Sequence, residues 1–265
     1  SKRHAMSGAV RFILIATIPA AAGLILIGKP MISLLERGAF DAEDSVLVYG
    51  ALRFFALGLI FQSIHEVIAR SFYADKDTLT PLWTSIIAAI ANVVIVGGLY
   101  LAYVYQFDDT VRAALTAWGE QYAGGDYSAA QQALAAASVE LNDLLAGVTG
   151  VGGLALGYSA TFLIELVLLL VILRRRWNGI DEGALGVTAL RAMAATAVMA
   201  AAVLAADAVM GALGWHDAGV LLTALRVLGL AGVGAVAFTA AGIVVGLREI
   251  RALPGMVLRR SATAP

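Results

Sequence analysis

The chain of 265 residues contains no cysteine, which excludes disulfide bonds and thiol chemistry. Its three histidines, at positions 4, 65 and 216, do not have the spacing of a metal site. The sequence also lacks a glycine-rich loop of the kind that holds nucleotide phosphates. No catalytic residue, cofactor or metal ligand is therefore predicted, and we do not expect an enzyme.

Charged residues are also scarce, at 14% of the chain, whereas 60% of the residues are hydrophobic and the mean hydropathy is +0.85. These values are typical of a polytopic membrane protein. The net charge is −1, which gives no indication of a nucleic-acid partner.

Long apolar runs account for this composition. About 20 apolar residues in a helix cross the roughly 30 Å of hydrocarbon in a bilayer. The first run is interrupted near Lys29 and Pro30, so its outer end is expected to be kinked or interfacial. The sequence predicts an all-α bundle of six transmembrane helices, at about 10–35, 46–70, 82–105, 151–173, 187–213 and 219–246.

The basic residues predict the orientation, because they concentrate in the cytoplasmic segments of membrane proteins. With the N-terminus inside, the inner segments hold twelve basic residues and the outer ones three, with most of the acids outside. Both ends of the chain are then cytoplasmic. The inner set is Lys2, Arg3, Arg11, Arg70, Lys76, Arg174, Arg175, Arg176, Arg248, Arg251, Arg259 and Arg260.

Residues 106–148 are polar, rich in alanine and net acidic. Helical apolar spacing at 109–122 and 128–146, with a break at Gly124–Asp126, predicts a two-helix hairpin on the outer face. The hairpin is a lid, a docking element or a spacer without function. It divides the chain into three spans at 1–105, the insert, and three spans with a cytoplasmic tail at 149–265.

A polar segment, Arg70-Ser-Phe-Tyr-Ala-Asp-Lys-Asp-Thr-Leu-Thr-Pro81, joins the second and third apolar runs. Pro81 suits the first turn of the following helix, and Asp77, Thr78 and Thr80 can accept hydrogen bonds from its free N–H groups. The segment resembles the MurJ/MviN lipid II flippases, within the superfamily of multidrug and oligosaccharidyl-lipid exporters. Ile18–Gly23, Leu35–Phe40 and Ala51–Gly58 are similar to segments just upstream in that family.

The resemblance implies the C-terminal lobe, with two trailing helices, of a two-lobed flippase in the bacterial cytoplasmic membrane. The expected substrate is lipid II, a polyprenyl-pyrophosphate-linked glycan, moved by alternating access. Residues 187–213 and 219–246 would form a groove for its tail among the membrane lipids. The chain has no initiator methionine, so we expect a fragment whose N-terminal lobe is missing. Alternatives are an exporter of drugs or other polyprenyl-linked glycans, and a non-transporting scaffold of cell-wall synthesis.

Ionisable residues inside the spans are candidates for substrate binding, because they are costly in the membrane. Arg53 and Arg226 either contact the anionic head group or extend to the interface. Glu165 lies about 13 Å from the inner surface, too deep to extend outward, and the family often has Asn there. It is expected to be protonated, paired or exposed to a wet cavity.

Glu66 and Arg70 are four residues apart, so they share a helix face at the inner end of the second span. They form either an interfacial ion pair or, with Asp77, a cytoplasmic gate that opens during transport. Asn92 has Val96 one turn later rather than an acid, which weakens the case for a cation site.

Overall fold

A computed structural model of the chain describes residues 2–177, 182–215 and 219–247, without the side chains of 2–5, Trp177 and Glu182. The predictions for Lys2, Arg3, His4, His216 and the four arginines after residue 247 therefore lie outside the described side chains.

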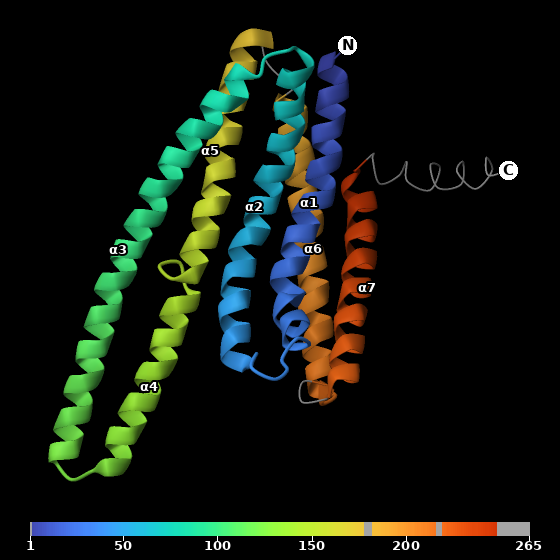
Figure 1. The fold of residues 1–265 in the computed structure, drawn as a ribbon. Coiled ribbons are helices and arrows are strands. Elements are labelled where there is room, and N and C mark those ends of the chain that lie inside the picture. Colours follow the sequence, from blue (N-terminus) through green and yellow to red (C-terminus); the bar gives the residue numbers. More distant parts are fainter. Residues whose placement is uncertain (1, 178–181, 216–218, 248–265) are drawn as a thin grey trace.

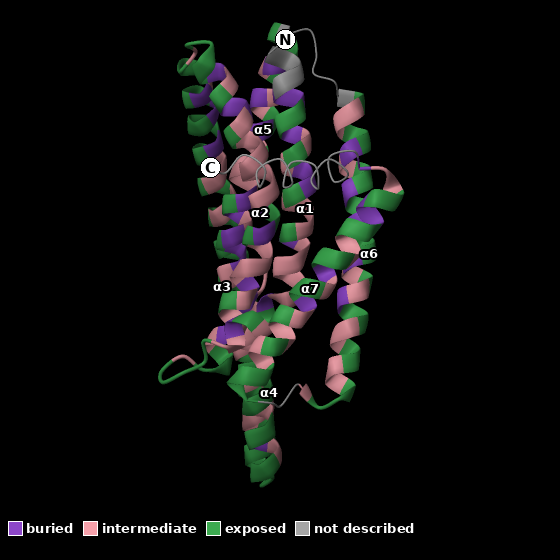
Figure 2. Cartoon of the chain, turned by 90° about the vertical axis from the view of Figure 1, so that its right-hand side faces the viewer, coloured by how far each residue is buried: buried purple, intermediate pink, exposed green. Residues whose placement is uncertain are grey.

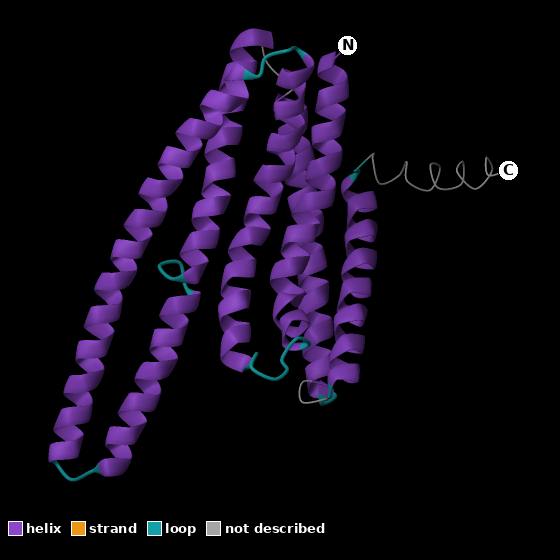
Figure 3. Ribbon diagram, in the orientation of Figure 1, coloured by secondary structure: helices purple, strands orange, loops and turns teal. Residues whose placement is uncertain are grey.

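The described residues form seven α-helices and no strand (Figures 1 and 3). Six candidate membrane spans are found in this part of the chain, one of which combines α4 and α5. This confirms the all-α membrane bundle with six spans. The helices are α1 (Lys2–Ser33), α2 (Ala42–Ala74), α3 (Leu79–Ala123), α4 (Tyr127–Ala146), α5 (Val151–Trp177), α6 (Glu182–Ala212) and α7 (Val220–Val245).

The first helix is not interrupted where the sequence analysis placed a break. Both Pro19 and Pro30 lie inside α1, which continues to Ser33. Proline removes one backbone hydrogen bond but keeps a helical φ, so a long apolar helix held by its neighbours can continue through it. Lys29 and Pro30 therefore do not end the helix, and the kinked or interfacial outer end stays a prediction.

The helix that contains the third span does not end at residue 105 but continues to Ala123. Helix α3 has 45 residues, equivalent to about 68 Å at 1.5 Å per residue. No glycine or proline lies between Leu99 and Trp118, and Arg112 pairs with Asp108 at 2.8 Å, one turn apart, so nothing in this sequence stops the helix. The break before α4 falls at Gly124–Asp126, as predicted.

The helix ends explain the turn between α2 and α3. Helix α2 begins with a capping box between Asp41 and Asp44. It ends where the N–H groups of Lys76 and Asp77 donate to Tyr73 and Phe72, with Lys76 in the left-handed conformation (φ 61°). The Thr78 side chain does not cap α3, contrary to prediction; Asp77 instead accepts from the Thr80 N–H at 3.0 Å.

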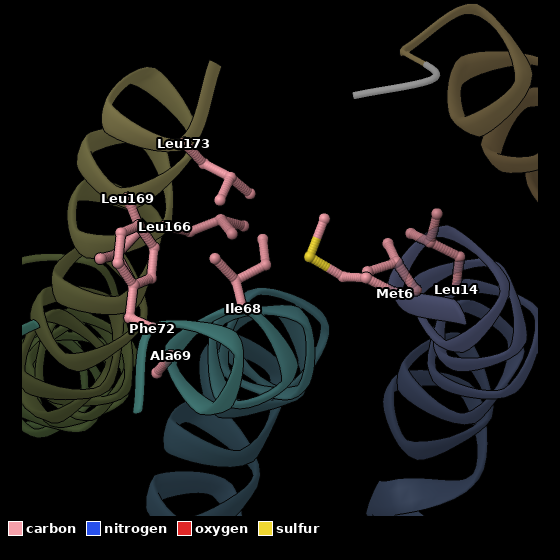
Figure 4. Packing of buried hydrophobic residues seen from close by; sticks show 9 residues of the cluster. Met6, Leu14, Ile68, Ala69, Phe72, Leu166, Leu169 and Leu173 are labelled. Atoms are coloured by element: carbon pink, nitrogen blue, oxygen red, sulfur yellow. The ribbon is translucent and has the colours of Figure 1, made fainter. Parts of the chain in front are cut away.

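Helix α5 lies between α2 and α3, which hardly touch each other beyond their turn (Figure 1). Helix α2 packs mainly on α5 and α1, α6 on α7 and α1, and α3 on α4 and α5. The main apolar core joins α1, α2 and α5, with Ile68 and Phe72 facing the leucines of α5 (Figure 4). Helix α4 is largely exposed (Figure 2).

The N-terminus, the α2–α3 turn and the end of α5 lie at one end of the bundle (Figure 1). The α3–α4 hairpin projects beyond the opposite end. This arrangement places the described basic residues Arg70, Lys76 and Arg174–Arg176 on a single side.

Candidate functional site

Helix α5 carries a line of polar side chains toward its two neighbours. Ser159 donates a hydrogen bond of 2.7 Å to the backbone oxygen of Phe54 on α2. Gly58 makes this approach possible, because a Cβ there would lie 2.3 Å from the Ser159 hydroxyl. The two helices therefore come closest where their polar groups can be satisfied.

Glu165 is the deepest charged residue of this line. It is 5% exposed, and its Oε1 accepts a hydrogen bond from the Ser85 hydroxyl of α3. His65 Nε2, from α2, lies 3.2 Å from the same oxygen. The His65 ring also lies 5.7 Å from the Phe162 ring, which holds the imidazole against α5. Three helices thus contribute to one buried polar cluster of His65, Ser85 and Glu165.

A second polar contact lies farther along α3 and α5. Asn92 Nδ2 donates to the Thr161 hydroxyl at 2.8 Å, and that hydroxyl donates to the Gly157 backbone oxygen at 2.9 Å. A neutral amide and hydroxyl paired in this way join the two helices. Among the described residues, no three His, Asp or Glu side chains are placed to hold a metal ion.

Asp77 ties the α2–α3 turn to the end of α5. Its carboxylate accepts from the Thr80 hydroxyl at 2.6 Å and from the Arg176 guanidinium. Hydrogen bonds from the side chain and backbone of Thr80, with a smaller contribution from Arg176, lower the pKa of Asp77 to about 2. The carboxylate is therefore ionised throughout the physiological range.

Glu66 and Arg70 form the predicted ion pair, at 3.0 Å, with side chains 58% and 73% exposed. Both residues belong to α2, so this pair joins no other helix. Exposed pairs of this kind contribute little to stability.

Arg53 is partly buried between α2 and the end of α4. Its Nη2 donates to the backbone oxygen of Ala146 at 3.3 Å, and its guanidinium lies 5.0 Å from the Phe54 ring centroid. Its Nε has no hydrogen-bond partner in the described part of the chain. Arg53 therefore stabilises the carboxyl end of α4 and keeps one donor unused.

Arg226 of α7 donates to Asp207 of α6 at 2.6 and 2.9 Å, with the Arg226 side chain only 12% exposed. The pair neutralises two charges that would each be costly in the membrane. Arg53, Glu165 and Arg226 have separate partners on different helices, so they do not form a single cluster.

An apolar groove of about 570 Å³ lies between α1, α6 and α7. The groove uses both trailing helices, as predicted for the lipid tail, but α1 forms its other wall. Its lining includes Pro19, Leu24, Met199, Ala231 and Phe238.

The sequence analysis identified Glu165 as a candidate residue but did not identify His65 and Ser85 as its partners. His65 and Glu165 both lie in the inner halves of their spans, five and nine residues from Arg70 and Arg174, which was the available signal. Pairing them requires the knowledge that α2 packs on α5, and apolar runs of equal length do not specify which helices are neighbours.

Residues 1–107 match the family model described as "Lipid II flippase MurJ". The lipid II flippase MurJ of Thermosipho africanus is 34% identical over 91 residues, which are 34% of this chain and 19% of that protein. The probable lipid II flippase MurJ of Haemophilus influenzae is 35% identical over 91 residues, or 34% and 18%. That of Rhizobium tropici is 38% identical over 84 residues, or 31% and 16%. The chain thus aligns with less than a fifth of the length of these curated relatives.

Proposed function

We propose that this chain, similar to the lipid II flippase MurJ over its first 107 residues, is part of a flippase that moves lipid II across the bacterial cytoplasmic membrane. The observation that carries the proposal is the family match over α1, α2 and most of α3. Six candidate spans in the described residues support a multi-pass membrane protein. Such movement requires no covalent chemistry.

The polar and apolar parts of the chain suit a substrate of this type. Lipid II joins an anionic pyrophosphate head group to a long polyprenyl tail. The apolar groove between α1, α6 and α7 fits a hydrocarbon chain. The Arg53 guanidinium is proposed to contact a phosphate oxygen when movement of α2 against α4 exposes it, because its unpaired Nε is buried in this structure.

Arg226 is a second proposed phosphate contact. It would release Asp207 and bind the head group in its place, because Nε and Nη2 of Arg226 are both engaged by Asp207 in this structure. Glu165 is proposed to act in the cavity through its partners rather than by direct contact with an anion of like charge.

A gate at the inner end is proposed at Asp77 and Arg176. Their ion pair joins the α2–α3 turn to α5, so its opening would free one element from the other. Glu66 and Arg70 flank this contact, and their exposed pair would exchange partners when the gate opens. Alternating access of a cavity then follows from movement between these helices.

Complementation tests the function. The full-length gene that includes this chain is expressed in a bacterium depleted of its own lipid II flippase, and growth is measured. Growth should be restored, and Arg53→Gln should reduce it, whereas Arg37→Gln in the exposed α1–α2 loop should not. Absence of rescue despite normal membrane expression would contradict the proposal.

Transport by the purified, reconstituted protein separates the alternatives. Lipid II flipping in vesicles supports the proposed substrate, while movement of only another polyprenyl-linked glycan or a drug favours a related exporter. Absence of all transport, with retained binding to cell-wall enzymes, favours a scaffold.

The gate has its own test, which uses the natural absence of cysteine. Asp77→Cys with Arg176→Cys is joined by a bifunctional thiol reagent in reconstituted vesicles. Flipping should stop and return when the cross-link is cleaved. The same treatment of Asp108→Cys with Arg112→Cys, an exposed pair within α3, should leave flipping unchanged.

A further inference from the structure

Two titratable side chains face each other inside the membrane-spanning part of the bundle. The His65 side chain is 13% exposed and the Glu165 side chain 7%, and Nε2 and Oε1 are 3.2 Å apart. A charge without a partner in such a place is very costly, whereas a pair that holds one proton in total is neutral. The pair is therefore stable when it carries a single proton.

The hydrogen bonds in this cluster do not occupy every acceptor of Glu165 and His65. Ser85 donates to Glu165, so the carboxyl group has one fixed partner. The contact between His65 and Glu165 is at ion-pair distance but lacks the geometry of a directed hydrogen bond, and His65 Nδ1 has no hydrogen-bond partner in the described part. Neither ring nitrogen of His65 is thus held by a directed hydrogen bond.

Several charged groups lie near this end of the bundle. On α2, Glu66 and Arg70 bond to each other, and at the start of α3 Asp77 bonds to Arg176 of α5. On α1, Arg11 follows Val10, which packs in the same core as Ile68, and Arg11 has an interaction of its own.

On the remaining helix near this end of the bundle, α6, Arg191 donates to the Gly246 backbone oxygen. Arg174 of α5 also has an interaction of its own. The groups that contact the Glu165 carboxylate most closely are therefore His65 and Ser85.

We propose that His65, Ser85 and Glu165 form a proton-binding site that couples the packing of α2 against α5 to proton uptake. The neutral pair takes one proton from water, which forms an O–H bond on Glu165 beside the protonated imidazole. The attraction between the two side chains is then lost and the imidazolium has no counter-charge, so α2 and α5 separate at this level and water reaches the imidazolium. Release of the proton to water restores the pair. The proposal rests on the flippase function, to which it assigns the coupling ion.

Infrared difference spectroscopy between acid and neutral pH tests proton binding by the full chain in lipid vesicles. The wild-type chain should give a band of a protonated carboxylic acid on acidification. Glu165→Gln should remove that band, whereas Glu36→Gln, which changes an exposed carboxylate of the α1–α2 loop, should not. A band that persists in Glu165→Gln overturns the proposal.

Ser85→Ala provides a milder variant that keeps both titratable groups. The band should remain but move to higher frequency, because the carbonyl loses its hydrogen bond. An unchanged frequency would show that the titrating carboxyl is not the one that Ser85 contacts, which also overturns the site.

Separation of α2 from α5 is tested with spin labels. The labels can be placed on introduced cysteines because the chain has none of its own. Tyr73→Cys on α2 and Val171→Cys on α5 replace exposed side chains, 53% and 46% accessible, near the same end. The distance between labels should increase on acidification, and His65→Gln or Glu165→Gln should abolish the change. A distance independent of pH in the otherwise wild-type chain overturns the coupling.

These readouts do not depend on transport. If the band and the distance respond as expected but no lipid II moves, the proposed function fails and the proton site stands. If wild-type vesicles move lipid II at the same rate with and without a pH gradient, the function stands and the coupling fails.

Discussion

Asp77 shows how one side chain serves two structural purposes at the inner end of the bundle. It caps the start of α3 through Thr80 and holds the end of α5 through Arg176. A carboxylate that accepts several hydrogen bonds is favoured in its charged form. The same residue therefore fixes both the turn and the ion pair proposed as a gate.

Thr80→Ala should raise the pKa of Asp77 from about 2 toward its ordinary value of 3.8, because the Thr80 hydroxyl makes the largest contribution. Thr80→Ser should leave it unchanged, and Arg176→Met should raise it less. The carboxyl ¹³C shift of Asp77, followed against pH, measures the change. A larger effect of Arg176→Met would contradict this account.

The pH dependence of stability follows from the sign of the shift. Because the folded-state pKa is lowered, the contribution of Asp77 is fully present above about pH 4 and is lost as pH falls through about 2. In Thr80→Ala that loss should begin at higher pH.

Arg226 and Asp207 should be strongly coupled in a double-mutant cycle. Arg226→Met or Asp207→Leu alone should cost roughly 2–3 kcal/mol, below the 3–5 kcal/mol of a fully buried pair, because Asp207 is one-third exposed. The double variant should cost less than the sum. Unfolding in detergent measures this, and Arg112→Met in the exposed pair of α3 should change stability by about 0.5 kcal/mol at most.

At the scale of the helices, close packing depends on a few glycines. A Cβ at Gly50 would lie 2.5 Å from the backbone oxygen of Ala146, so α2 and α4 meet through main chain. A Cβ at Gly98, in the middle of α3, would meet nothing within 4 Å. Gly50 is thus required for close helix packing, whereas Gly98 is not, although both lie inside long apolar helices.

Gly50→Ala should destabilise the chain by about 1–3 kcal/mol, because backbone atoms cannot move aside as a side chain can. Gly98→Ala should be neutral or stabilising by up to about 1 kcal/mol, since alanine is the better helix former. Thermal unfolding in detergent compares them. Equal effects of the two substitutions would rule out the proposed α2–α4 contact.

The sequence predicted the helices better than their ends. Apolar runs located all six spans because hydrocarbon thickness sets their minimum length. The end of α3 was missed because polarity marks the membrane surface, whereas helix termination is favoured by glycine, proline or a cap, and no glycine or proline lies between Leu99 and Trp118. Likewise, the pairs of Arg226 and Glu165 could not be predicted, because their partners belong to helices whose adjacency the sequence does not specify.

Over the whole molecule, the orientation in the membrane remains a prediction from the basic residues. In intact cells, a membrane-impermeant maleimide should label Gln131→Cys, on the exposed hairpin, and should not label Arg175→Cys until the membrane is opened. Each variant provides the single thiol of the chain. The reverse pattern would place the hairpin in the cytoplasm and invalidate the assignment of both termini.

Helix α3 is held to the bundle through α5 and α4 and is almost free of α2 beyond their turn. Over its length of about 68 Å, a tilt of only 10° about that turn would displace the far tip by roughly 12 Å. The α3–α4 hairpin thus acts as a long lever arm. Near its pivot, α3 packs against α5, the helix that carries Glu165. A shift of α3 by less than a nanometre inside the membrane would therefore move the tip of the α3–α4 hairpin much farther. A label or a binding partner at that tip could report the shift.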